Sequence, residues 1–463
     1  MLLNREDYLR VDAEYDGRGL EIRLNGDPYR VGYPSGVWGS LDEDAKKLIT
    51  DHIAFLSTNY LPMVLGKRGI IYSTRQPMLE SFAFKSTVYD LPSTALLDGH
   101  TAFDYIRRYY NIDFVYEGGE TVVWGKRYKS RDRAIISFTS GKESLLTLAV
   151  CMELGIEPIL VNIVEPSNIW EEKHRRSLLK RMAAEFGIEY HMIRHEPGVF
   201  HDGHRMGYKP SSLGWGSQLL YYLILFLPFM IHSRARYVFF GNENSCDKEA
   251  PHPEGFRTNY CFDQSSAWTQ QLDSAARILT NGSARVGSLV GPLNEIAVTK
   301  VLHEAYPDLA KYQMSCFCED PPAEEHRWCC ACSKCARTNA FIRGLGYDPR
   351  RVGFWEDMFT EEHANLFSAL NGEKTFGFDR SGLGREEQEL ALYMAAQREP
   401  KNRFLQKYME TSIYNGISGE GGAGNERFRH DYEFYMTPQP YPAIPEELRD
   451  GVYCLYNRIL RGG

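Results

Sequence analysis

The sequence predicts an α/β protein with a doubly wound, mostly parallel sheet. Short apolar runs alternate with longer helical segments between residues 131 and 345, the pattern typical of such sheets. A loop of small hydroxyl residues follows the first apolar run, where doubly wound sheets bind ligands. The composition, 43% hydrophobic and 25% charged over 463 residues, is that of a globular protein and excludes a disordered chain or a long coiled coil.

The alternation of short apolar runs and longer helical segments predicts four strands and three helices. Four short apolar runs are predicted strands, at 134–137, 158–164, 188–193 and 237–240. Three predicted helices connect them, at 143–154, 169–186 and 217–232. Gly155 and Gly187 end the first two helices, because glycine readily adopts the backbone conformation that follows a helix.

The chain divides into three predicted regions. Residues 1–130 form a smaller N-terminal β-rich region of unknown role: Leu20, Ile22 and Leu24 alternate with charged residues, Asn25-Gly26 marks a hairpin turn, and 121–124 is a further predicted strand. Residues 131–345 form the α/β domain, and 346–463 a mixed C-terminal extension.

Charge and hydropathy restrict the class of protein. The net charge of −8 provides no global basic field for nucleic acid. The most apolar run, 219–231, contains Pro228 and is shorter than the roughly 20 residues that a bilayer requires, so it predicts a buried core helix. The charged N-terminal stretch does not resemble a signal peptide. We therefore expect a cytoplasmic protein without a membrane span; homo-oligomerisation stays open.

The loop after the first predicted strand is the best candidate for phosphate binding. It reads Ile136-Ser-Phe-Thr-Ser-Gly-Lys-Glu-Ser144 and leads directly into a predicted helix. Free amides at a helix N-terminus attract anions, hydroxyl groups add donors, and Lys142 adds positive charge. The predicted nucleotide-binding residues are Thr139, Ser140, Gly141, Lys142, Glu143 and Ser144. The spacing is not that of a Walker loop.

The cysteines predict a metal site. Six of the ten cysteines lie between Cys316 and Cys335, and such clustering in a long chain is typical of metal ligation. Cys329, Cys332 and Cys335 are the first three predicted ligands, with Cys316 as the fourth and Cys318 as second choice. Four thiolates suit a closed tetrahedral Zn²⁺ site; an iron–sulfur cluster is the alternative.

The phosphate loop resembles the S-G-G-x-[DE]-S loop of the N-type ATP pyrophosphatases. Thr139 stands at the first serine, Ser140 at the first glycine, Glu143 at the acidic position and Ser144 at the last serine. The resemblance implies the adenine nucleotide alpha-hydrolase type of fold. It also implies that the loop holds the β- and γ-phosphates of ATP while the α-phosphate is attacked, so that AMP is transferred and pyrophosphate leaves.

Two families in this superfamily combine such a loop with a downstream cysteine knuckle, here 316–335. The closer resemblance is to the ATP-dependent UDP-MurNAc-L-Ala-L-Glu epimerases, and the more distant one is to 7-cyano-7-deazaguanine synthase. The epimerase resemblance covers roughly 134–396. It rests on Ser315-Cys316, Arg327-Trp-Cys-Cys-Ala-Cys-Ser-Lys-Cys335, Asn242-Glu-Asn-Ser245, 259–266, Pro292-Leu-Asn-Glu295, 374–378 and Glu386-Glu387.

Polar residues after the predicted strand 237–240 are expected at the ligand-binding edge. Asn242 and Ser245 could hold substrate oxygens, and Glu243 or Asp247 could hold Mg²⁺; an ordinary polar turn is the alternative. Lys142, Asn242 and Glu243 are the predicted catalytic residues, and Ser245 is a further nucleotide contact. Two further helix starts are weaker candidates, because Ser265 and Ser266 could simply cap one helix and Glu295 could complement the dipole of the other.

The histidines and the reaction outcome remain open on sequence alone. His195, His201 and His204 could carry a proton-transfer base or, for the last two, a metal, but exposed histidines are the simpler interpretation. Together the resemblances predict an enzyme that adenylates the carboxylate of a small molecule or peptide. The epimerase type would invert a terminal L-glutamyl or similar residue, and the synthase type would form an amide and then a nitrile. A degenerate nucleotide-binding module is the non-enzymatic alternative.

Overall fold

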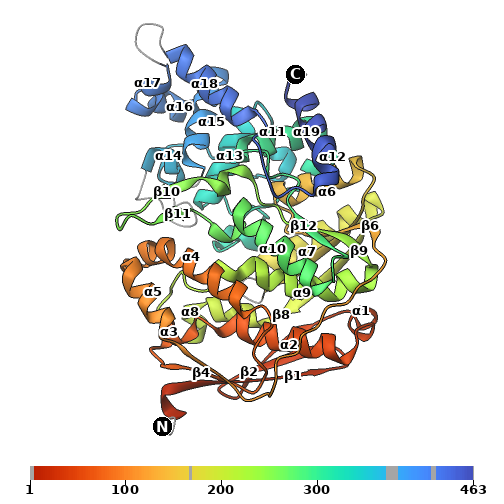
Figure 1. Ribbon diagram of the computed structural model, residues 1–463. Coiled ribbons are helices and arrows are strands. Elements are labelled where there is room, and N and C mark those ends of the chain that lie inside the picture. The colour runs from red at the N-terminus through yellow and green to blue at the C-terminus, as the bar shows by residue number, and fades with distance from the viewer. Residues whose placement is uncertain (1–4, 166–168, 372–383, 419–423, 462–463) are drawn as a thin grey trace.

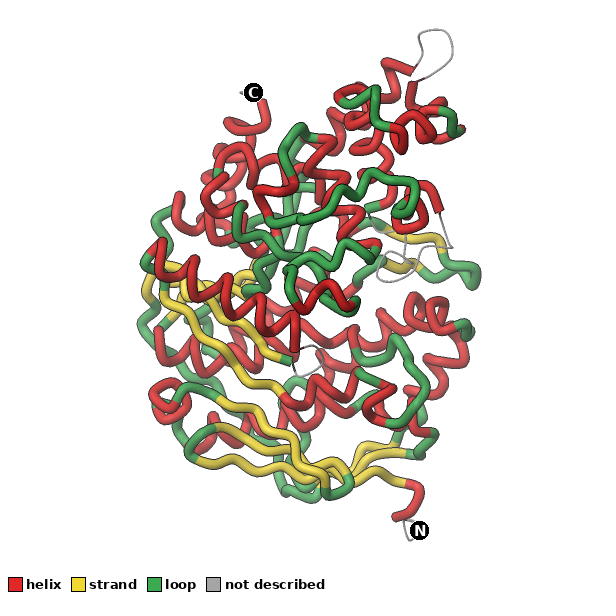
Figure 2. The backbone as a smooth tube through the Cα atoms, turned by 180° about the vertical axis from the view of Figure 1, so that it is seen from behind, coloured by secondary structure: helices red, strands yellow, loops and turns green. Residues whose placement is uncertain are grey.

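The computed structural model describes residues 5–165, 169–371, 384–418 and 424–461. Its centre is a ten-stranded sheet of order β12-β9-β6-β7-β8-β3-β2-β1-β4-β5, which runs through the middle and lower parts of the molecule in Figure 2. The first five strands in this order are mutually parallel. They are β12 (Arg285–Gly287), β9 (Ala235–Phe239), β6 (Arg131–Ser137), β7 (Glu157–Val164) and β8 (Glu189–His195).

Helices cover both faces of this parallel half. Ala134 and Ile136 of β6 belong to one apolar core and Ile135 to the other, because successive strand residues point to opposite faces. The first core includes side chains of α6 (Lys142–Glu153), α7 (Ile169–Phe186), α11 (Glu295–Ala305) and α13 (Ser333–Gly344). The second includes α9 (Gln218–Ser233) and α10 (Ser266–Leu279). The predicted doubly wound, mostly parallel α/β architecture is confirmed.

The N-terminal region extends the same sheet. Its strands are β1 (Tyr8–Asp16), β2 (Gly19–Leu24), β3 (Asp27–Gly32), β4 (Gly69–Tyr72) and β5 (Asp113–Tyr116). β3 pairs antiparallel with β8 through Val31–His195 and Gly32–Arg194. The helices of this region are α1 (Ser35–Gly39), α2 (Glu43–Thr58), α3 (Leu61–Leu65), α4 (Glu80–Asp98) and α5 (Ala102–Tyr110), so the region is α/β rather than β-rich.

Two local predictions in this region have opposite outcomes. The hairpin at Asn25-Gly26 is confirmed: both residues have positive φ, 52° and 102°, and they connect the antiparallel strands β2 and β3. The predicted strand at 121–124 is wrong, because this segment has no regular secondary structure. Val123 is 86% exposed, whereas Trp124 packs against the second apolar core without forming a strand.

The C-terminal extension is helical and lies at the end of the molecule opposite the N-terminus (Figure 1). Its helices are α14 (Ser368–Asn371), α15 (Arg385–Arg398), α16 (Arg403–Met409), α17 (Ser412–Ser418), α18 (Gly424–Met436) and α19 (Glu446–Arg461). α15 packs on α13, and α19 packs on α11. Further short elements include α8 (Gly203–Met206), α12 (Pro307–Ala310), the 3₁₀ helix Asn244–Asp247 and the hairpin β10 (Glu249–Pro251) with β11 (Arg257–Asn259).

The apolar helix α9 lies in the core. Within the described residues, the stretch Trp215–Ser233 is long and apolar enough to cross a membrane by length and composition. However, 78% of its apolar window is buried inside the structure. This is the environment predicted for 219–231, and Pro228 is accommodated within the helix.

Candidate functional site

The predicted phosphate loop lies at the reversal point of the parallel strand order. β6 is flanked by β7 on one side and β9 on the other, so its carboxyl end is where a doubly wound sheet binds ligands. The strand ends at Ser137, Gly141 is the N-cap of α6, and the helix begins at Lys142. Ser140 adopts φ 61°, a left-handed conformation that favours glycine, and it is the position where the resembled loop carries glycine.

Short contacts hold this loop in shape. The Ser144 hydroxyl donates to the Gly141 carbonyl at 3.0 Å, and the Met314 amide donates to the Ser140 carbonyl at 2.8 Å. A Cβ at Gly141 would lie 3.0 Å from Glu143 Oε2 and 3.3 Å from Thr139 Oγ1. The loop therefore has little room for a larger residue at position 141.

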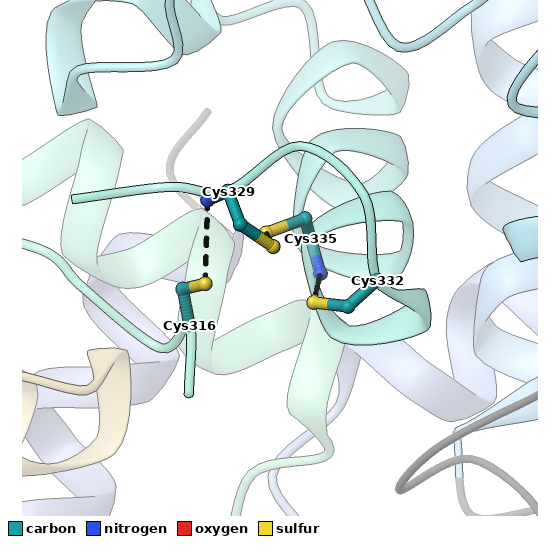
Figure 3. A group of neighbouring side chains, drawn as sticks. All are labelled: Cys316, Cys329, Cys332 and Cys335. Atoms are coloured by element: carbon teal, nitrogen blue, oxygen red, sulfur yellow. Dashed lines mark hydrogen bonds between the residues drawn. The ribbon is translucent and has the colours of Figure 1, made fainter. Parts of the chain in front are cut away.

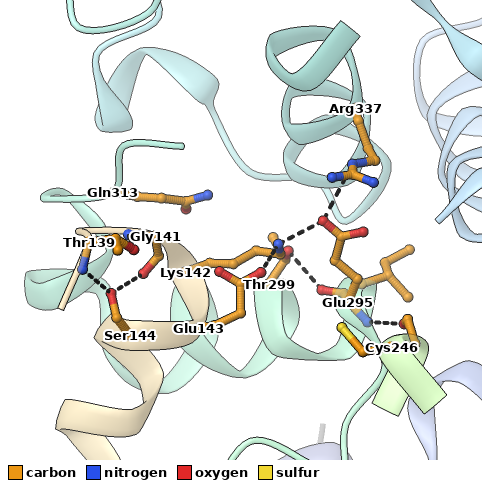
Figure 4. A network of polar contacts seen from close by, with 12 residues as sticks. Thr139, Gly141, Lys142, Glu143, Ser144, Cys246, Glu295, Thr299, Gln313 and Arg337 are labelled. Atoms are coloured by element: carbon orange, nitrogen blue, oxygen red, sulfur yellow. Dashed lines mark hydrogen bonds and ion pairs between the residues drawn. The ribbon is translucent and has the colours of Figure 1, made fainter. Parts of the chain in front are cut away.

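Lys142 is the centre of a buried ion-pair network (Figure 4). Its Nζ contacts the Glu143 carboxylate and lies 2.7 Å from Glu295 Oε1. Arg337 Nε from α13 lies 3.4 Å from the same Glu295 oxygen. The side chains of Lys142, Glu295 and Arg337 are at most 5% exposed, so these charges compensate one another away from solvent.

Two further carboxyl groups join this network. Glu243, after β9, is buried, and its Oε2 has no hydrogen-bond partner among the described residues. The Ser245 hydroxyl donates to Glu387 Oε1 at 2.6 Å and accepts from the Glu295 amide at 3.1 Å. Glu387 Oε2 accepts from the Ile296 amide at 2.7 Å. Glu243, Ser245 and Glu387 are thus brought together with the phosphate loop, although Glu387 is far away in sequence.

The pKa values of the buried carboxyl groups shift in different directions, depending on the charges beside each group. Burial and the Glu295 charge raise the pKa of Glu243 well above its usual range, and the same two effects raise that of Glu387 to about 7. Burial opposes ionisation of Glu295, but Arg337 and Lys142 lower its pKa below the usual value. Burial also opposes the charge on Lys142, whose pKa is nevertheless raised by Glu143 and Glu295.

Three of these carboxylates could hold a metal ion. One oxygen from each of Glu143, Glu243 and Glu295 lies within 4.8 Å of the others. Hard divalent cations prefer such oxygen ligands, and the unpartnered Glu243 oxygen offers one. The other proposed carboxylate, Asp247, lies outside this group and accepts from the Ser266 amide at 2.6 Å, at the start of α10.

Other sequence candidates have structural contacts. The Asn242 side chain is buried and donates to Thr269 Oγ1 at 3.0 Å. Ser265 caps α10 by accepting from the Trp268 amide at 3.2 Å, as the capping interpretation predicts. Asn294 is the N-cap residue of α11, which begins at Glu295.

The four predicted metal-ligating cysteines converge (Figure 3). The sulfurs of Cys316, Cys329, Cys332 and Cys335 lie within 4.8 Å of one another. Tetrahedral zinc with bonds of about 2.3 Å places its sulfurs about 3.8 Å apart, and the sulfurs of Cys329 and Cys335 are 3.8 Å apart. Backbone amides donate to three of the sulfurs: Cys318 and Cys329 to Cys316, Ala331 to Cys329, and Cys335 to Cys332. This buried group could hold a zinc ion.

The structure distinguishes the fourth ligand from the spare cysteines. Cys318 Sγ lies 3.9 Å from the carbonyl oxygens of Cys316 and Arg327, and Cys318 is not a member of the four-sulfur group. Cys330 is also outside that group, although it is buried. Both residues have positive φ, 56° and 55°. The geometry therefore favours Cys316 over Cys318.

A pocket beside the phosphate loop contains residues that sequence reasoning missed. It is lined by residues at and just after the carboxyl ends of β6 and β7, including Thr139 and Glu165. Arg175 and Tyr222 complete the lining. His195 Nδ1 lies 3.6 Å from Glu165 Oε1, and His195 Nε2 lies 2.5 Å from the Tyr221 hydroxyl. Glu165 follows β7, and His195 ends the neighbouring parallel strand β8. The position of Glu165 directly after a predicted strand is the sequence signal that could have identified it.

The three histidines have different environments: His204 is exposed, as expected, whereas His195 and His201 are not. His195 is 1% exposed, so that interpretation is wrong for it. His201 stacks between Tyr60 and Trp215 at centroid distances of 5.2 and 4.2 Å, and burial lowers its pKa to about 4. Within the described ranges, neither His201 nor His204 belongs to a group that could hold a metal.

No model of a known protein family matches the sequence, and a search of curated proteins finds no match. Of the segments that carry the epimerase resemblance, 374–378 lies outside the described residues, whereas Glu387 belongs to the buried network.

Proposed function

We propose that this protein is an ATP-dependent enzyme that adenylates a substrate carboxylate and releases pyrophosphate. The observation that carries the proposal is the position of the loop 139–144. It joins the central strand β6 to α6 at the reversal point of the strand order, beside three carboxylates that could hold a cation. Free amides at the start of a helix and a neighbouring cation are the features that a triphosphate requires.

The residues present fit the two implied metals. Glu143, Glu243 and Glu295 would hold Mg²⁺, which neutralises phosphate charge when bound. The four cysteines would hold Zn²⁺, and because all four positions are thiolates, the site leaves no position for a reacting water. The zinc would therefore have a structural role.

Adenylation on this site needs no covalent protein intermediate. A carboxylate oxygen attacks the α-phosphorus of ATP, and the bond from that phosphorus to the bridging oxygen of the β-phosphate breaks. Pyrophosphate leaves, and an acyl-adenylate remains. The amides at the start of α6 and the hydroxyls of Thr139 and Ser144 hold the leaving phosphates, and Lys142 contributes positive charge to them.

The favoured outcome is epimerisation of a terminal glutamyl or similar residue of a peptide, such as a peptidoglycan precursor. The acyl-adenylate makes the neighbouring Cα–H acidic. Glu165, held by His195 and Tyr222, is our candidate base. Burial opposes its ionisation, but the neighbouring His195 lowers its pKa below the usual value, so it is a carboxylate at neutral pH. A proton is then returned on the other face, and water releases AMP.

The test incubates the purified protein with ATP, Mg²⁺ and peptides ending in L-glutamate, nucleotide-linked precursors included, in D₂O. We expect pyrophosphate and AMP release together with deuterium at the substrate Cα. Pyrophosphate release that requires ammonia, without deuterium, would instead support the amide- and nitrile-forming alternative on a deazapurine carboxylate. No pyrophosphate release with either substrate class would favour a degenerate nucleotide-binding module.

A Glu165→Gln variant separates the two chemical steps. It should retain pyrophosphate release and lose deuterium incorporation about 10²–10⁴-fold, the usual contribution of a positioned base. Glu172→Gln, on the same pocket, is the matched control. Loss of pyrophosphate release in Glu165→Gln alone would assign Glu165 to nucleotide or substrate binding.

A further inference from the structure

Helix α13 begins inside the four-cysteine group, and Arg337 in its first half reaches the phosphate site. Cys332 is its N-cap residue, and Cys335 lies in its first turn. Lys334 and Arg337 are three residues apart and therefore share one face of the helix. Arg337 comes from α13 to the upper side of the network around Glu295 in Figure 4.

Arg337 contacts a carboxylate of the phosphate site, and Lys334 follows Cys332 on the same helix. Arg337 Nε is 3.4 Å from the Glu295 oxygen that also contacts Lys142. Lys334 Nζ lies 3.9 Å from the centre of the Phe317 ring, and its charge, together with those of Arg337 and Lys142, offsets the effect of burial on the pKa of Glu295. Lys142 thus supplies positive charge from the loop, and α13 supplies it from a different direction.

A second connection joins the cysteine group to the loop. The Met314 amide donates to the carbonyl of Ser140, the residue held in the left-handed conformation. Cys316 follows two residues later and is one of the four converging cysteines. The cysteine group is therefore attached to the phosphate site through α13 and through the segment 314–316.

We propose that α13 forms a second wall of the phosphate site, in which Lys334 and Arg337 contact the phosphates of ATP, and that zinc on the four cysteines is required to hold this wall in place. The inference rests on the proposed function, because it assumes that the loop binds ATP. When Mg²⁺ occupies the carboxylates, their negative charge is neutralised, and the three cations become available to the phosphates.

Calorimetry on the zinc-loaded full chain tests the proposal with two probes, MgATP and adenosine. Lys334→Met and Arg337→Met should bind MgATP about 10- to 100-fold more weakly, the usual effect of losing a charge-assisted hydrogen bond. Adenosine has no phosphate, so its affinity should stay unchanged. Lys180→Met, an exposed position on α7, is the matched control and should bind both probes as the unaltered chain does.

Zinc content and thermal unfolding of each variant show whether the wall, rather than the fold, has changed. Unchanged zinc content and Tm together with weaker MgATP binding support the proposal. If both variants bind MgATP as tightly as the unaltered chain does, the proposal is overturned. Equal loss of adenosine and MgATP binding also overturns it, because that pattern means general disruption. If the unaltered protein binds no MgATP, the proposed function itself fails.

Removing zinc from the unaltered chain should weaken MgATP binding before circular dichroism shows that the sheet unfolds. Unchanged affinity without zinc would contradict the zinc requirement.

Discussion

The thiolate group and the carboxylate group are both candidate metal sites, but they are assembled in opposite ways. The four cysteines come from 20 residues of chain, and backbone amides donate to three of their sulfurs. The three carboxylates come from α6, the segment after β9 and α11, and Lys142 already balances two of them. We therefore expect the thiolate group to need a bound metal to keep its local fold, and the carboxylate group to keep its shape without one.

The strongest way to break this comparison is to remove a thiolate. Cys332→Ser should release zinc and destabilise the protein substantially, because structural zinc contributes on the order of 10 kcal/mol to folding of its site. Metal analysis and thermal unfolding measure both effects. Cys330→Ser, a buried neighbour outside the group, should keep its zinc. Full metal content in the Cys332 variant would mean that the cysteines are not the ligands.

A change in the phosphate loop should abolish activity without unfolding the chain. Gly141→Val adds a branched side chain at a position where even a Cβ would lie only 3.0 Å from Glu143 Oε2. The added side chain should block the approach of a phosphate. We expect pyrophosphate release to fall by at least about 10²-fold, the usual cost of losing one such donor group. Gly36→Val, where a Cβ meets nothing within 4 Å, is the control. Normal turnover by the Gly141 variant would show that the loop is not the phosphate site.

The carboxylate site should respond to Mg²⁺ rather than to zinc. Glu243→Gln removes the oxygen that lacks a partner among the described residues, so the Mg²⁺ concentration for half-maximal activity should rise about tenfold or more. A Mg²⁺ titration of pyrophosphate release measures this shift. Glu249→Gln, an exposed position a few residues away, should behave as the unaltered chain does. An unchanged Mg²⁺ requirement would place the cation elsewhere.

The last expected effect is a dependence of stability on pH. The pKa of Glu387 is raised to about 7 in the folded protein from 4.5, so the folded state binds the proton more tightly than the unfolded state. Its contribution to stability is full below about pH 4.5 and is lost as the pH rises toward 7, by at most about 1.4 kcal/mol per pH unit. Denaturant unfolding of Glu387→Gln between pH 5 and 8 should show a shallower decline. An identical decline in both proteins would assign the pH dependence to other groups.

The sequence predicts the parallel half of the fold because each element there has a local pattern. The runs 134–137 and 158–164 are strands in the structure, and 169–186 is a helix. Spacing predicts Cys329, Cys332 and Cys335 as one group, and the structure places Cys316 rather than Cys318 with them. The N-terminal region is predicted less completely, because its strand signals indicate only β structure. Its helix α2 nevertheless has a local start signal, Asp42, whose side chain accepts from the Ala45 amide.

The composition of the buried network could not be predicted from local patterns. Glu387 meets Ser245 across 142 residues of sequence, and Arg337 meets Glu295 from another helix. Neither contact has a local signal, because both arise from the packing of α11, α13 and α15. Glu295 also shows that one residue can satisfy two interpretations: it begins a helix, as the dipole argument requires, and it pairs with the loop lysine.

The pairing of β3 with β8 has a consequence for how the chain folds. These strands are separated by more than 150 residues, so β3 is an open edge strand until β8 has been synthesised. Open edges template pairing with other chains, and contacts so distant in sequence form slowly. Synthesis therefore passes through a stage at which the N-terminal sheet is complete except for this edge, and that stage is where aggregation during expression should begin.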